Sequence, residues 1–239
     1  MIALTMCALL LVAEQPDARA QAVVDRLIGA LGGEEGWSRA RFIQFTFARE
    51  GRRLHIAWDR WTGRYRLEAT NDAGIPYSVI MNLNTRQGNA ILDGRPLRDR
   101  ELSDYLNRAT RIWAGETYWL LMPYKLRDPG VVVAFDGEES VGGRLYDRLH
   151  LRFEDVGLTP GDEFWVYVNR ETGLVDRWRF RLESGFEGDY RWSGWQRFGG
   201  ILLATERRSE AGETIRFEDI FVSDVVPEEV FSLSGAPSR

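Results

Sequence analysis

The chain has 239 residues, of which 44% are hydrophobic and 28% charged, so it can bury a sizeable core and does not have the composition of a disordered protein. Its formal net charge is −5, and its basic residues alternate with acidic ones, which argues against a nucleic-acid-binding protein. The single cysteine, Cys7, and the two histidines, His55 and His150, exclude an internal disulfide, a thiolate metal site and a multi-histidine metal site, and leave only mixed or carboxylate metal sites possible. We predict no metal and no cofactor.

The chain starts with an uncharged apolar run, MIALTMCALLLVA, which has the length of a signal-peptide core and is too short to span a bilayer. We interpret residues 1–20 as a signal peptide and leader, cleaved after Ala13 or near Ala20. The protein is then periplasmic or otherwise exported, with no transmembrane span in its mature form. No basic segment precedes the run, so a buried N-terminal helix is the alternative. The bulky Met6 before Cys7 argues against lipid attachment at that cysteine.

The next segment, ARAQAVVDRLIGALGG, predicts an amphipathic helix. Its apolar residues from Val23 to Leu31 recur at helical spacing, and Gly32-Gly33 can end the helix in the left-handed conformation. We expect the following EEGWSRA to be a short turn, with Trp37 packed between the helix and a sheet.

From Arg41 the hydrophobic period changes to two, which is typical of strands. Five such runs follow, separated by turns such as Glu50-Gly51, Thr62-Gly63 and Asp93-Gly94. They predict a meander with strands at 43–47, 54–58, 65–69, 77–83 and 90–92.

A central helix is predicted over DRELSDYLNRATRIWAG, with Asp99 as its N-cap and Gly115 as its end. The apolar segment YWLLMPYKLRDPG comes next. Pro123 and Pro129 interrupt it, so we expect a short helix or an extended segment lying over the sheet.

The second half of the chain contains seven strand-like runs, VVVAFDG, LYDRLHLRFE, DEFWVYVNR, LVDRWRFRLE, DYRWSGW, ILLATERR and ETIRFEDIFVS, before a short tail element, VPEEVF. In LVDRWRFRLE, apolar side chains share one face of the strand and arginines share the other. A sheet of eleven or twelve strands with one apolar face has to curl, pack on a second sheet, or be covered by helices.

We therefore predict a mainly β (α+β) fold, in which residues 21–239 form a single domain. It would be an unclosed, strongly curved antiparallel β-barrel with two or three helices covering its concave face. Such a shape can leave an apolar ligand cavity, and ordinary core packing is the alternative for each residue that would line it. The candidate cavity residues are those on the apolar register: Phe45, Phe47, Ile56, Trp58, Tyr65, Leu67, Val79, Met81, Leu149, Leu151, Trp178, Phe180, Ile215 and Phe217.

The order of these elements resembles the bacterial lipoprotein-carrier superfamily of LolA-like, LolB-like and outer-membrane lipoprotein-sorting-like proteins. The resemblance is carried by the helix ending in Gly-Gly, the meander from RFIQFTF, the helix before YWLLMPYKL, and the strands DEFWVYVNR and TGLVDRWRF. It implies an unclosed barrel with a helical lid that holds acyl chains of lipids or lipoproteins in the periplasm. An arginine at the cavity mouth helps to close the lid in these carriers. Arg41 and Arg60 are candidates here, and we leave that role unassigned.

No catalytic residues are predicted. The chain has no Gly-x-Ser-x-Gly pattern, and its adjacent carboxylates would point to opposite faces of a strand. Asp219 falls in the apolar register, where we expect it to pair with an arginine, and a polar anchor for a ligand headgroup is the alternative. The favoured hypothesis is a non-enzymatic carrier whose partners are lipid or lipoprotein acyl chains. The second hypothesis is a non-enzymatic envelope interaction or scaffold module with a filled core and a protein partner.

Overall fold

The structure is a computed structural model that describes residues 17–153 and 161–232. The strands are β1 (Phe42–Arg49), β2 (Arg52–Asp59), β3 (Arg64–Thr70), β4 (Pro76–Asn82), β5 (Gln87–Leu92), β6 (Arg95–Pro96), β7 (Val131–Val141), β8 (Arg144–Phe153), β9 (Glu163–Asn169), β10 (Val175–Arg181), β11 (Glu187–Phe198), β12 (Ile201–Ser209) and β13 (Thr214–Ser223). The helices are α1 (Ala18–Ala30), α2 (Gly33–Arg39) and α3 (Asp99–Leu121), with 3₁₀ turns η1 (Met122–Lys125) and η2 (Glu228–Phe231).

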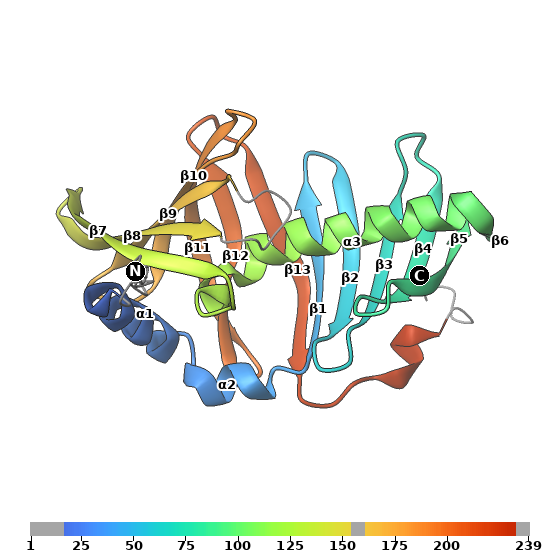
Figure 1. The fold of residues 1–239 in the computed structure, drawn as a ribbon, viewed down its shortest axis with the longest axis horizontal. Coiled ribbons are helices and arrows are strands. Elements are labelled where there is room, and N and C mark those ends of the chain that lie inside the picture. The colour runs from blue at the N-terminus through green and yellow to red at the C-terminus, as the bar shows by residue number, and fades with distance from the viewer. Residues whose placement is uncertain (1–16, 154–160, 233–239) are drawn as a thin grey trace, which may run out of the picture.

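In the described residues, all thirteen strands belong to one antiparallel sheet, in the order β6-β5-β4-β3-β2-β1-β13-β12-β11-β10-β9-β8-β7. β6 and β7 are its two edges, so the sheet is curved but not closed (Figure 1). The predicted fold class is confirmed. The sheet has one strand more than the upper count predicted, because β6 is only two residues long and carries no alternation.

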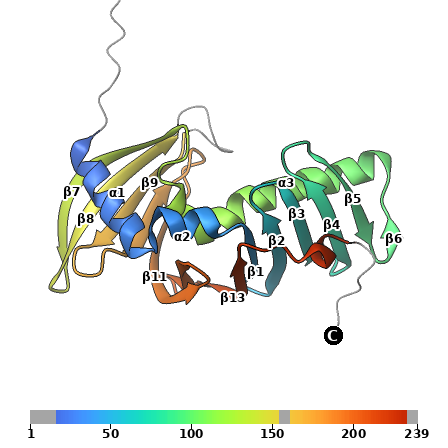
Figure 2. The same cartoon turned by 90° about the horizontal axis from the view of Figure 1, so that it is seen from below.

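The chain enters the sheet in the middle and fills it in two meanders. β1 to β6 run out to one edge, α3 crosses back along the sheet, and β7 to β13 return from the other edge until β13 pairs with β1 (Figure 1). Seen from below, α1 lies near β7 and β8, whereas α3 extends toward β5 and β6 (Figure 2). The helix α3 is therefore both the crossover between the two halves and a cover over the sheet.

The helix α1 forms where the sequence predicts it. Asp17 caps it by accepting hydrogen bonds from the backbone N–H groups of Arg19 and Ala20, at 2.9 and 3.1 Å. The buried face carries Ala20, Val23, Val24, Leu27 and Ile28. The helix includes 18–20, which we had assigned to the leader. The apolar run at 1–13, with Cys7, lies outside the described residues.

Three predictions about the helices are wrong. The EEGWSRA segment, expected as a turn, forms α2, whose first turn contains Glu34 and Glu35 where carboxylates favour the helix N-terminus. The helix α3 does not end at Gly115 but continues to Leu121, because the burial of Leu120 and Leu121 outweighs the roughly 1 kcal/mol cost of a helical glycine. The residue that precedes its first turn is Arg98, so Asp99 is not its N-cap.

The prediction for Asp219 is also wrong. β1 and β13 change register between Gln44 and Thr46, which leaves Asp219 and Ile220 opposite a single residue of β1. Asp219 adopts a φ of 52° and turns outward, where it accepts a hydrogen bond from the Thr46 hydroxyl at 2.9 Å. A bulge thus moves this carboxylate from the apolar face to the opposite face, and its partner is a threonine, not an arginine.

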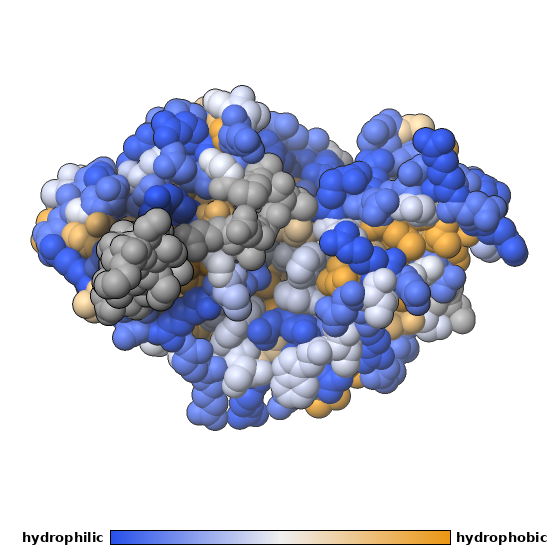
Figure 3. Space-filling model, viewed as in Figure 1, coloured by the Kyte–Doolittle hydropathy of each residue, from blue (hydrophilic) through white to orange (hydrophobic). Residues whose placement is uncertain are grey.

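The main core lies on the concave face of the sheet, under α1 and α3. On the convex face, a smaller cluster of Phe42, Ala57 and Val226 packs against Val230 and Phe231, so the predicted tail element closes over β1 and β2. Figure 3 shows a mainly hydrophilic exterior, with hydrophobic patches near α3. No helix in the described part of the chain is long and apolar enough to cross a membrane.

Candidate functional site: an aromatic pocket beneath helix α3

A pocket of about 510 Å³ opens between the C-terminal part of α3, the segment after η1, and strands β7 to β10, with Arg49 of β1 at its border. We call it the aromatic pocket, because eight aromatic side chains line it: Trp113, Tyr118, Trp119, Phe153, Phe164, Trp178, Phe180 and Phe186. Three of these rings come from α3 and the others from the sheet and the β10–β11 turn. The helix therefore forms one wall of the pocket.

Trp178 lies at the centre of this ring cluster and is 2% exposed. Its ring centroid is 4.6 Å from that of Trp119 in an edge-on contact, and 5.5 Å from that of Phe164 in a stacked contact. Its indole N–H is buried without a hydrogen-bond partner in the described structure. Because this nitrogen is buried, the pocket wall at Trp178 is apolar.

The remaining lining includes charges of both signs. Lys125 Nζ lies 2.5 Å from Asp128 Oδ2, and Arg49 pairs with Glu213. Asp162 accepts a hydrogen bond from the backbone N–H of Glu183 at 2.9 Å. The apolar rings therefore account for most of the binding surface, and the charged groups do not select one sign of ligand charge.

An internal arginine, Arg207 of β12, ties α3 to the sheet beside this pocket. Its guanidinium is fully buried and donates to the carbonyl of Trp119 at 2.9 Å and to that of Ala204 at 3.0 Å. It also stacks 3.4 Å above the Trp192 ring. Burial lowers the pKa of this guanidinium well below its ordinary value.

Neither arginine that we considered for the cavity mouth lies there. Arg41 pairs with Asp59 at 3.1 Å. Arg60 donates to the carbonyls of Trp37 and Ala40 at the end of α2 and stacks 3.4 Å above the Trp37 ring. Both therefore hold α2 and the β2–β3 turn. Arg207 is a fully buried arginine that donates to a carbonyl of α3.

The fourteen predicted cavity residues all contribute to the concave face, but they separate into two groups. Trp178 and Phe180 line the aromatic pocket. The other twelve belong to the packed core or lie against it: Phe45, Phe47, Ile56, Trp58, Tyr65, Leu67, Val79, Met81, Leu149, Leu151, Ile215 and Phe217. Whether any of the fourteen contacts a ligand stays a prediction.

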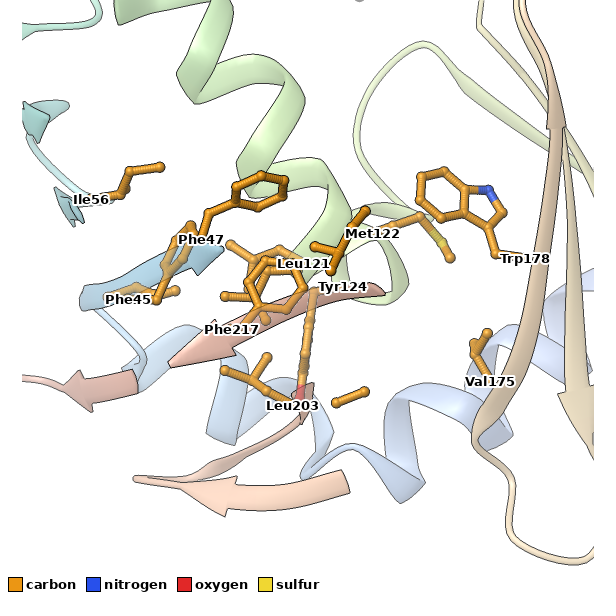
Figure 4. Close-up of a cluster of buried hydrophobic side chains, with 14 of the residues drawn as sticks. Phe45, Phe47, Ile56, Leu121, Met122, Tyr124, Val175, Trp178, Leu203 and Phe217 are labelled. Atoms are coloured by element: carbon orange, nitrogen blue, oxygen red, sulfur yellow. The ribbon is translucent and has the colours of Figure 1, made fainter. Parts of the chain in front are cut away.

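The half of the sheet around β1 to β5 is filled by its own side chains. The Phe217 ring lies 5.8 Å from those of Phe45 and Phe47, in edge-on contacts (Figure 4). Trp58 meets Trp113 of α3 at 5.4 Å. In this half, α3 covers packed rings, and the aromatic pocket lies in the other half.

Sequence reasoning missed most of the aromatic pocket. Phe164 alternates with Val166 and Val168 in its strand, so the period-two pattern alone could have included it. Tyr118 and Trp119 were visible as part of the apolar YWLLMPY segment, but their position over β10 depends on α3 continuing past Gly115. No sequence signal indicates Phe186, which lies in a turn.

The described residues contain no group of three or more His, Cys, Asp and Glu side chains that could hold a metal ion. A further pocket of about 530 Å³ lies where α2 meets β12 and β13, lined by Gly32, Glu35, Gly36, Arg39, Ala40, Gly199, Gly200, Val222, Ser223 and Asp224. Its lining is polar and glycine-rich, so it is a poorer site for an apolar ligand than the aromatic pocket.

No family model matches the chain, and no curated protein does. Among solved structures, it is similar to a DUF1329 family protein from Desulfovibrio piger, with 13% identity and a TM-score of 0.49. It is also similar to a putative outer membrane lipoprotein-sorting protein domain from Vibrio parahaemolyticus, with 9% identity and a TM-score of 0.46. Each comparison covers 90% of this chain and 98% of the other. The chain is also similar to a LolA superfamily protein from Nitrosomonas europaea, with 13% identity, a TM-score of 0.48 and the same coverage.

Proposed function

We propose that this protein is an exported, non-enzymatic carrier that binds a lipidic or acyl ligand in the aromatic pocket. The observation that carries the proposal is the pocket itself, with its eight aromatic rings and its volume of about 510 Å³. Small-molecule sites of roughly 300–1,000 Å³ with mainly apolar linings are typical of ligand-binding proteins. Each ligand methylene buried there would contribute about 0.8 kcal/mol of binding free energy.

The acyl chain would come from a lipid or a lipoprotein, and the expected place of action is the periplasm or another part of the cell envelope. The run at 1–13 supports export. The binding role needs no reactive group, and the pocket lining has neither histidine nor cysteine.

Gly115 offers a direct test, because it lines the aromatic pocket and a Cβ atom there would meet no atom within 4 Å. In Gly115→Leu the new side chain enters the pocket, and a helical glycine is replaced by a strong helix former. Displacing two methylenes of ligand would cost about 1.6 kcal/mol, or about tenfold in affinity. We expect laurate to raise the melting temperature of the wild type saturably, and Gly115→Leu to need about ten times more laurate for the same shift.

The matched control is Gly29→Leu. Gly29 is also a helical glycine with no atom within 4 Å of an added Cβ, but it lies in α1 and does not line the pocket. It should bind laurate as the wild type does. The carrier proposal fails if native mass spectrometry after mild extraction shows no bound lipid and laurate does not shift the wild-type melting temperature.

The filled half of the sheet favours a second candidate, an envelope interaction module. The packed rings of Phe45, Phe47 and Phe217 leave no room for a ligand under that part of α3. Two results together would favour this module over the carrier: a stable protein partner in pull-downs, and melting temperatures of the wild type and Gly115→Leu that laurate does not change.

A further inference from the structure

The convex face carries a separate hollow of about 290 Å³, on the outer side of strands β8 to β12. Its lining includes four arginines, Arg144, Arg177, Arg191 and Arg208. These side chains alternate along their strands with the concave-face residues, so the hollow and the aromatic pocket lie on opposite faces of the sheet.

Three of these arginines form one row across adjacent strands. Arg177 of β10 lies opposite Arg191 of β11, and Arg191 lies opposite Arg208 of β12. Like charges that are directly opposite on neighbouring strands destabilise a sheet. Such a row is therefore unfavourable unless counter-charges neutralise it.

The outer two members have carboxylate partners, and the central one has none among the described residues. Arg177 Nε lies 2.8 Å from Asp189 Oδ1. Arg208 Nη2 lies 3.3 Å from Glu206 Oε1. The other oxygen of this carboxylate, Oε2, lies 3.4 Å from Arg216 Nε. Within the part of the chain that the structure describes, no carboxylate lies within 4.0 Å of the Arg191 guanidinium.

The carboxylates that line the hollow do not balance its arginines. The lining carboxylates are Asp176 and Glu206, and Arg177 is paired with Asp189 and lies 3.7 Å from Glu139. In the described residues, no carboxylate lies within 4.0 Å of the Arg144 or Arg191 guanidinium. Asp176 is already engaged, because it accepts hydrogen bonds from the Tyr146 hydroxyl at 3.2 Å and the Asn169 amide at 2.8 Å. The hollow therefore has an excess of positive charge centred on Arg191.

We propose that this hollow is a binding site for a phosphate group, with Arg191 as its central ligand. A phosphate can accept two parallel hydrogen bonds from one guanidinium and further bonds from its neighbours, which suits the arginine row. The volume lies at the small end of the range for ligand sites, so the occupant is a small phosphate ester or a lipid headgroup rather than a polymer.

The test titrates inorganic phosphate and glycerol phosphate against the full chain at constant ionic strength, with chloride as the reference anion, and follows the melting temperature. We expect both phosphates to stabilise the wild type more than chloride does. Arg191→Gln should weaken the binding of both by about tenfold, because it removes a charge-assisted pair of hydrogen bonds, and Arg191→Lys should lie in between. The matched control is Arg152→Gln, an exposed arginine on the outer side of β8 that does not line the hollow.

Flotation with vesicles of phosphatidylglycerol or phosphatidylcholine distinguishes the two sources of phosphate. Flotation with phosphatidylglycerol vesicles that is lost in Arg191→Gln but kept in Arg152→Gln assigns the site to a lipid headgroup. Stabilisation by soluble phosphates without flotation assigns it to a soluble ester. The proposal is overturned if phosphates act no better than chloride, or if Arg191→Gln and Arg152→Gln respond alike. None of these outcomes depends on laurate binding in the aromatic pocket.

Discussion

At the residue scale, Pro123 leaves one carbonyl of α3 without its usual helical donor. The Trp119 carbonyl would accept from the backbone N–H of residue 123 in a continuing helix, and proline has none. Arg207 supplies that hydrogen bond from β12 at 2.9 Å. A buried charge without a carboxylate partner is thus retained where the end of the helix needs a donor.

We expect Arg207→Met to lower the free energy of unfolding by about 1–3 kcal/mol, because it leaves buried carbonyls without donors. Pro123→Ala restores an N–H for the Trp119 carbonyl, so the cost of Arg207→Met should be smaller in that background. A double-mutant cycle measured by urea unfolding checks this. Strictly additive effects would show that the two residues do not share the carbonyl.

Asp59 makes stability depend on pH. Burial alone would raise its pKa, but hydrogen bonds from Arg41, Thr62 and Arg64, at 3.1, 2.7 and 3.1 Å, hold the pKa well below its usual value. Because the folded pKa is depressed, the ionised carboxylate stabilises the protein above its unfolded pKa of about 3.9, and this contribution is lost as the pH falls.

We therefore expect Asp59→Asn to cost about 3 kcal/mol of unfolding free energy at pH 7 and progressively less below about pH 4. Urea unfolding of both proteins at pH 7 and pH 3 tests this. Asp72→Asn is the control, because its pair with Arg108 is on the surface. A cost for Asp59→Asn that does not change with pH would contradict the linkage.

At the scale of elements, the period of the hydrophobic pattern predicted the strands, which depend on neighbouring residues. It failed to predict helix ends that depend on packing against residues far away in the sequence. The strands of both meanders follow from strict alternation, as in Trp178 and Phe180 of β10. Gly115 looked like a helix end because its local preference is clear, but burial of Leu120 and Leu121 from across the fold carries α3 onward. The wall of the aromatic pocket that α3 provides was therefore not predicted.

The bulge at Asp219 shows a second limit. A period-two pattern does not show where a β-bulge inserts a residue. Every residue after the bulge is then assigned to the wrong face of the sheet. Phe221 follows Phe217 and Asp219 at period two, yet it is 49% exposed, whereas Val222 is buried. The register change arises from pairing with β1, which is more than 170 positions earlier in the chain, and no local feature of β13 predicts it.

At the scale of the whole molecule, α3 covers two different parts of one sheet. The part around β1 to β5 is packed with side chains, and the other part contains the aromatic pocket. The α3 segment over β4 and β5 rests on close-packed residues such as Met81, whereas its last two turns rest on the aromatic pocket. Regions with fewer packed contacts open more readily, so the backbone at 113–119, which lines the pocket, should exchange amide hydrogens faster than that at 65–81.

The carrier hypothesis makes a specific prediction for this asymmetry. A ligand in the aromatic pocket supplies the missing contacts, so laurate should slow exchange at 113–119 and 178–192 and leave 65–81 unchanged. Hydrogen exchange followed by mass spectrometry measures all three segments in one experiment. Gly115→Leu should show slow exchange at 113–119 without laurate, because its side chain takes the place of the ligand. A uniform slowing across the sheet would instead indicate global stabilisation, and laurate binding in the pocket would then lose its support.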